Sequence, residues 1–439
     1  EHYLQTHAHS NTDTVDLWQA LEESSKKPVK KFMHAWTTKS GFPVLRVSSD
    51  SQTTLNQTRF FINPKHTKKS DDVWPISLQS DNKQLPDLLD KNELTLPFKI
   101  NATKLNLGQT GFYRVSYDTR QLEQIGAQVK LGDLSPIDRL GVLSDAFESA
   151  KAGFINTVDA LRFMNNFEHE DNSAVWDVMV GSIGATRSVM DDETLRDNMK
   201  PFITSLASKQ YKRLGWQAKK SDSYFDQLLR PTILGMMSGA DYKDAVNEAL
   251  GRFDGSKRLE DIEPDLRSII FHTAVRIRND KKTFDKLFDL YETSHLSEEK
   301  TVIASALTGF KSPTLYKKAL SLIKTDVVRA QDISYWVVYS FSNRFARQET
   351  WKWMTENWSW LEKTIGSDLS FYRFPIYAAN AFSDKSFIPE YTKFFSKHSN
   401  SALERTIKQG LETLTWQSDW KERDLKSVKE FFNTYKLSS

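Results

Sequence analysis

The sequence predicts a mainly α-helical protein that carries one small β domain near its beginning. Three successive patterns support this prediction. Apolar residues follow helical spacing up to about residue 40, alternate with polar residues to about residue 118, and return to helical spacing from Ser135 onward. We therefore expect a short helical segment, a β-sandwich and an α-helical solenoid, in that order.

The length also indicates more than one domain. A chain of 439 residues exceeds what a single compact core usually holds. We place the boundaries where the pattern changes. The helical segment takes residues 1–40, the β-sandwich residues 41–130 and the solenoid residues 131–439.

The first segment ends in a clearly amphipathic stretch. Its apolar residues stand at i, i+3, i+4 and i+7, which is one face of a helix, and they are Val29, Phe32, Met33 and Trp36. Gly41 and Pro43 end this helix. Such a short helical segment has little to pack against by itself. We expect it to be the tail of a domain encoded further upstream.

The following region has the period of β-strands. Residues 74–79, 94–101 and 113–117 each alternate apolar and polar side chains, as in a strand with one buried and one solvated face. About five such runs, separated by clusters of Asn, Asp, Lys and Pro, indicate a small antiparallel sandwich.

From Ser135 the pattern is helical. Ser135 and Pro136 provide an N-cap and a first-turn proline. The stripe that follows consists of Ile137, Leu140, Leu143, Phe147 and Ala150. Similar stripes recur at residues 284–291, 312–322, 351–361 and 403–414. Helices of roughly 10–18 residues joined by short turns indicate a HEAT-like stack with a concave, bowl-shaped face.

Composition excludes several classes of protein. The chain has 60 basic and 57 acidic residues, so its net charge of +3 gives little support for nucleic-acid binding. No run approaches the ~18 apolar residues that span a bilayer. Zero cysteines exclude disulfides, thiolate metal sites and thiol catalysis, and fit a reducing compartment. We expect no nucleic-acid partner, no membrane partner and a cytoplasmic location.

The sequence carries no complete catalytic motif. None of its 9 histidines forms H-E-x-x-H, in which two imidazoles one helical turn apart bind zinc. His169-Glu170 begins this motif, but Ser173 ends it. His2, His7 and His9 cluster near a terminus, where adventitious metal binding is conceivable. Phosphate-binding and nucleophile-elbow motifs are also missing. We expect no autonomous active site and no cofactor in this chain.

Four tryptophans lie close together at positions 351, 353, 358 and 360. Trp351 and Trp358 share a helical stripe with Met354 and Leu361, which favours core packing. Trp353 and Trp360 are left to pack at the surface or to line a groove.

Two stretches, Pro28–Arg46 and Thr110–Asp118, resemble the gluzincin family of zinc aminopeptidases, which includes the aminopeptidase N, puromycin-sensitive and endoplasmic-reticulum types. Further similar stretches follow in the family's order, at residues 136–141, 150–153, 214–216, 228–230, 331–332, 351–358 and 404–424. Each is weak alone, whereas their order and spacing are specific.

The resemblance implies that the chain is the C-terminal portion of such an enzyme. Residues 1–40 would be the tail of an absent zinc catalytic domain, which is then a partner of this chain. The helical domain would enclose the active site and bind the peptide substrate, and the intact enzyme would use zinc. The family's zinc and substrate-amine motifs lie upstream of residue 1, so the chain should be inactive alone.

The resemblance also implies one substrate-binding residue. In several members an arginine of the helical domain reaches the substrate pocket near a segment similar to residues 371–382, which places it at Arg373. A guanidinium can pair with a substrate carboxylate or carbonyl. The competing interpretation is an arginine at a solvated helix end.

Two other functions stay open. The chain is alternatively a stand-alone α-solenoid scaffold whose concave face binds a peptide or protein, because a helical stack by itself does not reveal its function. A helical-barrel enzyme acting on carbohydrates suits the β-patterned region and the order of motifs poorly.

Overall fold

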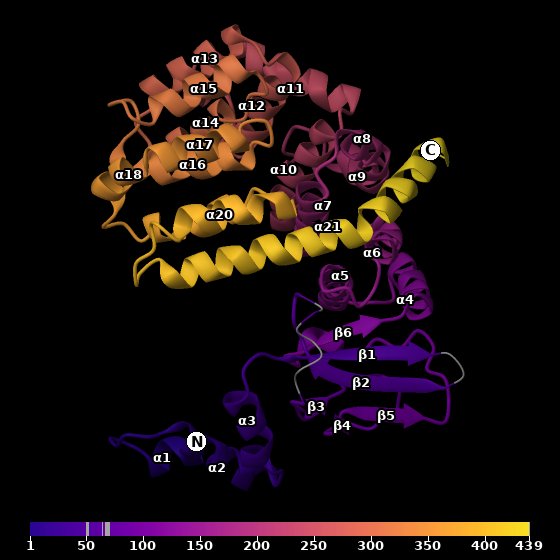
Figure 1. Ribbon diagram of the computed structural model, residues 1–439. Helices are drawn as coiled ribbons and strands as arrows, with labels where there is room; N and C mark the ends of the chain where they lie inside the picture. The colour runs from indigo at the N-terminus through magenta and orange to yellow at the C-terminus, as the bar shows by residue number, and fades with distance from the viewer. Residues whose placement is uncertain (50–51, 64, 66–70, 439) are drawn as a thin grey trace. The chain divides into compact units, whose positions relative to one another are not determined.

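The computed structural model describes residues 1–49, 52–63, 65 and 71–438, and it divides into two compact units, residues 1–167 and 168–439 (Figure 1). The predicted fold class is confirmed, since a small sheet near the beginning is followed by helices to the end. The domain boundaries drawn from the sequence stay a prediction. His66, one of the nine histidines, lies outside the described residues.

Three helices open the first unit: α1 (His2–Thr6), α2 (Thr14–Ser25) and α3 (Val29–Thr38). Asp13 caps α2 by accepting a hydrogen bond from the amide of Val15, while the Asp16 side chain accepts one from the Asp13 amide. Trp18 is the one buried side chain in these three helices as described. This segment therefore contributes little core of its own.

A four-stranded sheet forms the centre of the first unit. Its strands are β1 (Pro43–Ser49), β2 (Thr53–Arg59), β5 (Glu93–Leu96) and β6 (Arg114–Tyr117), in the order β5-β2-β1-β6. A second, two-stranded sheet pairs β3 (Ile76–Ser77) with β4 (Leu88–Leu89).

The prediction of an antiparallel sandwich is wrong for one strand pair, because β1 and β6 are parallel. The chain crosses from β5 at one edge of the sheet to β6 at the other, and it enters β6 in the direction of β1. The strand predicted over residues 94–101 is also shorter, since β5 stops at Leu96. Pro97 has no amide hydrogen to continue the ladder.

The helices α4 (Thr119–Leu131), α5 (Pro136–Lys151) and α6 (Thr157–Met164) complete the first unit. Ser135 caps α5 as predicted, by accepting a hydrogen bond from the amide of Asp138. Ile137, however, is 47% exposed and does not belong to the buried stripe. The neighbouring Asp138 is buried instead, because its carboxylate accepts a hydrogen bond from the amide of Gly108 at 2.8 Å.

The second unit consists of helices. They are α7 (Ser173–Val189), α8 (Glu193–Asn198), α9 (Lys200–Leu214), α10 (Tyr224–Gly239), α11 (Lys243–Gly255), α12 (Pro264–Arg278), α13 (Lys281–Thr293), α14 (Ser297–Leu307), α15 (Pro313–Leu322), α16 (Ile333–Ser342), α17 (Arg347–Glu356), α18 (Trp358–Ile365), α19 (Phe374–Asn380), α20 (Ile388–Phe395) and α21 (Glu404–Ser438). None of the described helices combines the length and hydropathy that crossing a bilayer requires.

Alternate helices of this unit form two layers. In what we call the inner row, α10, α12, α14, α16 and α19 pack against one another in sequence. In the outer row, α11, α13, α15 and α17 each pack against a helix of the inner row (Figure 1). This alternation is the arrangement of a helical solenoid.

The last helix exceeds the expected length. α21 has 35 residues, whereas we expected roughly 10–18 residues per helix. It packs against α19 and α20 at its beginning and against α8 and α9 towards its end (Figure 1). There the ring of Phe202 contacts Phe432, with ring centroids 5.4 Å apart. The final helix of the unit thus stabilises its first helices.

The tryptophan cluster shows one correct and one wrong expectation. Trp351 and Trp358 are both buried, which confirms core packing. They lie on two helices rather than one stripe, because α17 ends before Asn357 and α18 begins after it. Trp353 and Trp360 are half-buried and pack edge to face, with ring centroids 6.3 Å apart.

Candidate functional site

Helices of the second unit, several of them from the inner row, line a cavity of about 770 Å³. Its lining comes from α7, α8, α9, α10, α12, α14 and α16, together with the turns that follow α10, α14 and α16. Ligand pockets typically measure about 300–1,000 Å³. We call it the inner cavity, and it is large enough for several residues of a peptide.

Small residues at helical spacing keep the inner cavity open. Gly235 and Gly239 are one turn apart on α10, and Gly309 follows α14. A Cβ atom added at Gly239 would meet no atom within 4 Å, and at Gly235 it would meet only Ile269 at 3.8 Å. Larger side chains at these positions would therefore extend into the space that a ligand needs.

Positive charge dominates the wall. Among the described residues that line the cavity, the acidic side chains are Glu193, Asp197 and Asp241, and the cationic ones are Arg187, Arg196, Lys200, Arg276, Lys311 and Arg344. The cations thus outnumber the carboxylates two to one, although the whole chain is nearly neutral with 60 basic and 57 acidic residues. This cavity concentrates the small positive excess of the chain and favours an anionic ligand.

Carboxylates of the wall neutralise part of this charge. Lys200 pairs with Asp197 at 2.5 Å and with Asp241 at 2.7 Å, and Asp241 also pairs with Arg276. Burial opposes the charge on Lys200, but its hydrogen bonds to the two carboxylates outweigh burial and raise the pKa of Lys200. These cations are already engaged within the protein.

A second carboxylate engages three arginines. Asp191 lies between α7 and α8, and its side chain is only 5% exposed. It accepts hydrogen bonds from Arg196 at 3.0 Å and from Arg344 and Arg347 at 2.8 Å each. Burial tends to raise the pKa of Asp191, but the three guanidinium groups outweigh this effect and hold that pKa below its usual value.

The three arginines also line a smaller cavity of about 290 Å³, to which α19 contributes Tyr377. Arg196 and Arg344 belong to the linings of both cavities, so the two spaces are neighbours. The Asp191 cluster therefore stands where the two cavities meet.

Arg187 differs from the other arginines of the wall, Arg196, Arg276 and Arg344, which pair with carboxylates. It lies in the last turn of α7, and within the described residues its guanidinium has no hydrogen bond or ion pair. Burial is the main cause that lowers the pKa of Arg187, and the charges of Arg196 and Arg276 add to it. A recessed arginine without a carboxylate partner is well suited to receive a carboxylate from a ligand.

Neutral polar groups complete the wall. His272 Nε2 lies 2.9 Å from the Ser305 hydroxyl, and burial lowers the pKa of His272, which favours the uncharged imidazole. Tyr339 of α16 also lines the cavity. These groups can exchange hydrogen bonds with a peptide backbone.

Arg373, the substrate-binding residue that the sequence suggested, lies outside both cavity linings. It is exposed and immediately precedes α19. Its position is one helical turn before Tyr377, which lines the smaller cavity. Its role in substrate binding stays a prediction.

The structure contains no candidate zinc site among its described residues, where no three His, Asp or Glu side chains come together suitably for a metal ion. His169 lies in a turn and is exposed, so the incomplete motif at residues 169–173 is not helical at its start. His2 contacts Glu23 at 3.1 Å.

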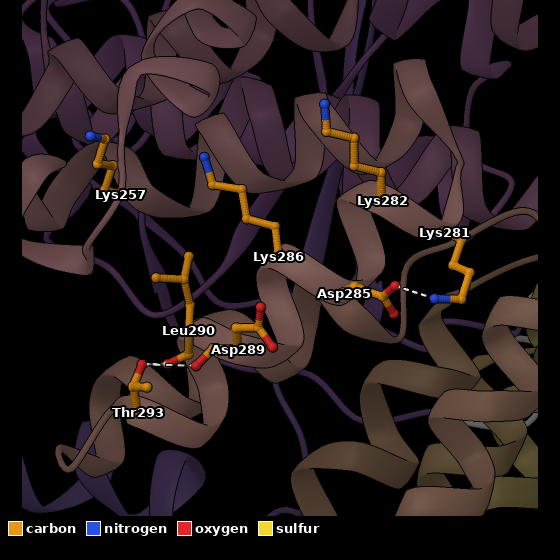
Figure 2. A pocket seen from close by; sticks show the side chains of 8 residues that line it. All are labelled: Lys257, Lys281, Lys282, Asp285, Lys286, Asp289, Leu290 and Thr293. Carbon is orange, nitrogen blue, oxygen red and sulfur yellow. Dashed lines mark hydrogen bonds and ion pairs between the residues drawn. The ribbon is translucent and has the colours of Figure 1, made fainter.

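A second basic pocket, of about 590 Å³, lies on the outer row (Figure 2). Lysines 257, 281, 282 and 286 line it together with Asp285 and Asp289. Lys281 pairs with Asp285, and the ammonium of Lys286 donates to the carbonyl oxygen of Ser256 at 2.7 Å. We call it the outer pocket.

The sequence of the inner helices contains the pattern that lines the inner cavity. Inner helices repeat small or polar residues every fourth position, as at Gly235 and Gly239 of α10 or at Ser268, His272 and Arg276 of α12. A polar stripe of this kind normally indicates a solvated face. Only the packing of these helices around one space distinguishes a cavity wall from an outer surface.

Comparison with known proteins agrees with the resemblance seen in the sequence. Residues 102–415 match the family model described as the ERAP1-like C-terminal domain. The chain is 30% identical to aminopeptidase 2 of Candida albicans over 98% of the chain and 48% of the relative. It is 28% identical to aminopeptidase M1 of Arabidopsis thaliana over 96% of the chain and 50% of the relative.

A bacterial relative gives the same result. The chain is 27% identical to aminopeptidase N of Lactococcus lactis over 99% of the chain and 52% of the relative. The chain thus spans about half the length of the curated relatives it matches. It belongs to the ERAP1-like C-terminal domain family and corresponds to the C-terminal portion of an aminopeptidase.

Proposed function

We propose that this chain is the non-catalytic C-terminal region of a zinc-dependent aminopeptidase, and that its helical unit encloses the active site and binds the peptide substrate in the inner cavity. The observation that carries this proposal is the cavity of about 770 Å³ with an unpaired arginine in its wall. Family membership supports the reaction class, since the relatives named above are aminopeptidases.

The chain's own groups suit peptide binding rather than bond cleavage. The open surface at Gly235 and Gly239 accommodates a peptide backbone. Arg187 receives a carboxylate of the peptide, while His272 and Tyr339 offer hydrogen bonds. Zinc and its activated water belong to the catalytic domain, so the isolated chain should not hydrolyse peptides.

The domain division follows from the same proposal. Residues 1–40 are the tail of the zinc domain, residues 41–130 a β domain and residues 131–439 the helical domain. The first segment leaves apolar side chains exposed that a catalytic domain would cover, namely Leu4, Val15, Leu17 and Leu21. The N-terminal catalytic domain is thus the partner we propose. The lack of cysteine fits the cytoplasm.

Arg373 is a second binding residue in this proposal. It is exposed, and no hydrogen bond or ion pair of its side chain is found in the described part of the chain. Tyr377, one helical turn after Arg373, lines the smaller cavity, so we expect Arg373 to act on a ligand bound there. Replacing Arg373 with alanine in the full-length enzyme should change the KM or kcat for peptides. Unchanged kinetics with acidic, neutral and basic peptides would contradict this role.

The decisive experiment fills the inner cavity without disturbing the packing around it. Gly239→Phe introduces a ring where an added Cβ meets no atom within 4 Å. In the full-length enzyme we expect the KM for a decapeptide to rise about tenfold or more, which corresponds to ~1.4 kcal/mol, while turnover of an aminoacyl p-nitroanilide stays unchanged.

Gly251→Phe is the matched control. Gly251 lies on α11, is exposed and also has no atom within 4 Å of an added Cβ, but it does not line the cavity. Equal effects of the two substitutions on the decapeptide, or no effect of either, would contradict peptide binding in the inner cavity.

A stand-alone binding scaffold is the alternative. One observation favours it, since the second unit alone supplies every lining residue of the inner cavity. The reading frame upstream of Glu1 decides between the two functions. An H-E-x-x-H motif there supports the enzyme, and a start codon directly before Glu1 supports the scaffold.

A further inference from the structure

The arginines near the inner cavity fall into two groups, according to whether a carboxylate already pairs with them. Arg196, Arg344 and Arg347 converge on the carboxylate of Asp191, at distances of 2.8–3.0 Å. Arg187 has neither a hydrogen bond nor an ion pair of its side chain among the described residues. The protein thus supplies its own carboxylate to these three arginines, and Asp241 to Arg276, and it leaves Arg187 without one.

The Asp191 cluster resembles an occupied carboxylate site. Three guanidinium groups around one carboxylate form the arrangement with which proteins bind carboxylates and phosphates from ligands. The Asp191 side chain is 5% exposed, and two of its partners, Arg196 and Arg344, also line the inner cavity. A ligand anion that reached these arginines would compete with Asp191 for the same donors.

Such competition is unfavourable while Asp191 carries its charge. A ligand that displaced Asp191 would leave a buried carboxylate without its ion pairs, and an uncompensated buried charge is costly. The three arginines also hold the pKa of Asp191 below its usual value after outweighing the effect of burial, so Asp191 stays ionised near neutral pH. A ligand anion therefore does not readily bind these three arginines, whereas Arg187 can bind it without displacing a carboxylate of the protein.

We propose that Asp191 determines the specificity of the inner cavity. By occupying three arginines, Asp191 restricts the cavity to ligands that present a single carboxylate, which Arg187 receives, and it prevents preferential binding of peptides with several acidic groups. This inference rests on the proposed role of the inner cavity as a peptide site. Arg187 contacts the ligand, and Asp191 acts as a positioning residue through the arginines.

Four peptides test the proposal by calorimetry on the purified chain. The first is Ala-Ala-Ala-Ala amide, which has no carboxylate. The second is the same peptide with a free C-terminus, and the third is Ala-Ala-Glu-Ala amide, so that one carboxylate comes from either the terminus or a side chain. The fourth is Ala-Glu-Glu-Ala with a free C-terminus, which has three carboxylates.

For the unmodified chain we expect a peptide with one carboxylate to bind at least tenfold more tightly than the neutral amide. The second and third peptides show whether the terminus or a side chain supplies that carboxylate. The peptide with three carboxylates should gain no further affinity. Arg187→Ala should abolish the preference for one carboxylate over none.

Asp191→Asn is the central variant, because it keeps the shape of the side chain and removes its charge. We expect the peptide with three carboxylates to bind at least tenfold more tightly than to the unmodified chain, while peptides with one carboxylate change less than threefold. Asp285→Asn on the outer pocket is the matched control and should leave all four affinities unchanged.

The double variant Asp191→Asn with Arg347→Gln controls for misfolding, because it keeps the net charge of the unmodified chain. It leaves Arg196 without a carboxylate partner and Arg344 with Glu193 alone. It should also favour the peptide with three carboxylates. If both variants retain the selectivity of the unmodified chain, the role of Asp191 is wrong and the cavity remains a peptide site. If the unmodified chain does not distinguish the neutral amide from one carboxylate and Gly239→Phe has no effect, the proposed function itself is wrong.

Discussion

The inner cavity and the outer pocket are both basic, yet the protein holds their charges differently. Beside the inner cavity, the Asp191 carboxylate that pairs with three arginines is only 5% exposed. In the outer pocket, Asp285 is 38% exposed and its partner Lys281 is 78% exposed (Figure 2). Solvent therefore screens the second pair and not the first.

An excess of positive charge therefore does not by itself make a binding site. The ammonium groups of Lys257 and Lys282 extend from the ribbon towards the same side as that of Lys286 (Figure 2), on side chains that are long and flexible. Apart from Arg187, the arginines of the inner cavity are oriented by ion pairs before a ligand arrives. Preorganised, poorly hydrated cations discriminate between ligands, whereas solvated lysines provide weak and general attraction.

The comparison predicts a large difference in stability between two carboxylate deletions. Asp191→Ala should lower the free energy of unfolding by about 3–5 kcal/mol, because it removes the buried carboxylate that three arginines share in a poorly solvated site. Asp285→Ala should lower it by about 1 kcal/mol at most, because exposed pairs contribute little. Urea unfolding measures both values. Similar losses for the two variants would show that the inner pairs are as well solvated as the outer ones.

Two glycine-to-alanine substitutions, one at a closely packed glycine and one in the outer row, should differ less in their effect on stability. A Cβ atom at Gly410 of α21 would lie 2.0 Å from the Tyr391 hydroxyl and 2.9 Å from the carbonyl oxygen of Pro375. Gly410→Ala should therefore destabilise the protein by about 1–3 kcal/mol. Gly251→Ala on α11 meets no atom within 4 Å and should stabilise it by about 0.4–1 kcal/mol. Thermal unfolding of both variants checks the two signs.

The two buried carboxylates Asp191 and Asp145 should respond to pH with opposite signs. Asp145 of the first unit accepts hydrogen bonds from the amide of Val115 and from Arg114, but burial prevails and raises its pKa from 3.8 to about 6. Between these two values the folded protein holds a proton that the unfolded chain has released. The contribution of Asp145 to stability is therefore largest below pH 3.8 and falls as the pH rises to about 6.

Asp145→Asn should remove this decline, as measured by the free energy of unfolding between pH 4 and 7. For Asp191 the pKa is lowered instead, so its contribution is present above pH 3.8 and is lost as the pH falls below that value. An unchanged slope in Asp145→Asn would show that another group titrates in this range.

The smallest effects should come from the outer lysines. Lys257→Ala and Lys282→Ala should each change the free energy of unfolding by less than about 0.5 kcal/mol, since the two ammonium groups have no hydrogen bond or ion pair within the described part of the chain. Peptide affinity should change less than twofold. A tenfold loss of affinity in either variant would indicate that the peptide binds in the outer pocket and not in the inner cavity.

Local patterns in the sequence predicted much of the fold because short-range physics decides them. Ser135 caps its helix through a neighbouring amide, and Trp351 and Trp358 are buried as their spacing indicated. The parallel pairing of β1 and β6 was not predictable in this way. Strand direction depends on how the chain crosses the sheet, and alternation along one strand contains no information about its neighbour.

The candidate site was less predictable for the same reason. Arg373 came from a resemblance, and the structure places it outside the cavity linings. Asp191 and Arg344 are 153 positions apart, and neither lies in a motif that suggests a contact. Arg187 resembles any arginine in the last turn of a helix until its lack of a partner is seen.

The amino-acid sequence was sufficient to predict the order of helical and β regions and the caps of individual helices. It also indicated membership in a family of aminopeptidase C-terminal regions. These properties depend on neighbouring residues and on their order along the chain. The tertiary structure alone decided which polar stripes enclose a cavity and which cations a carboxylate already holds. Both depend on distances between helices remote in sequence, and the strength of a charge interaction depends on how far the fold removes it from water.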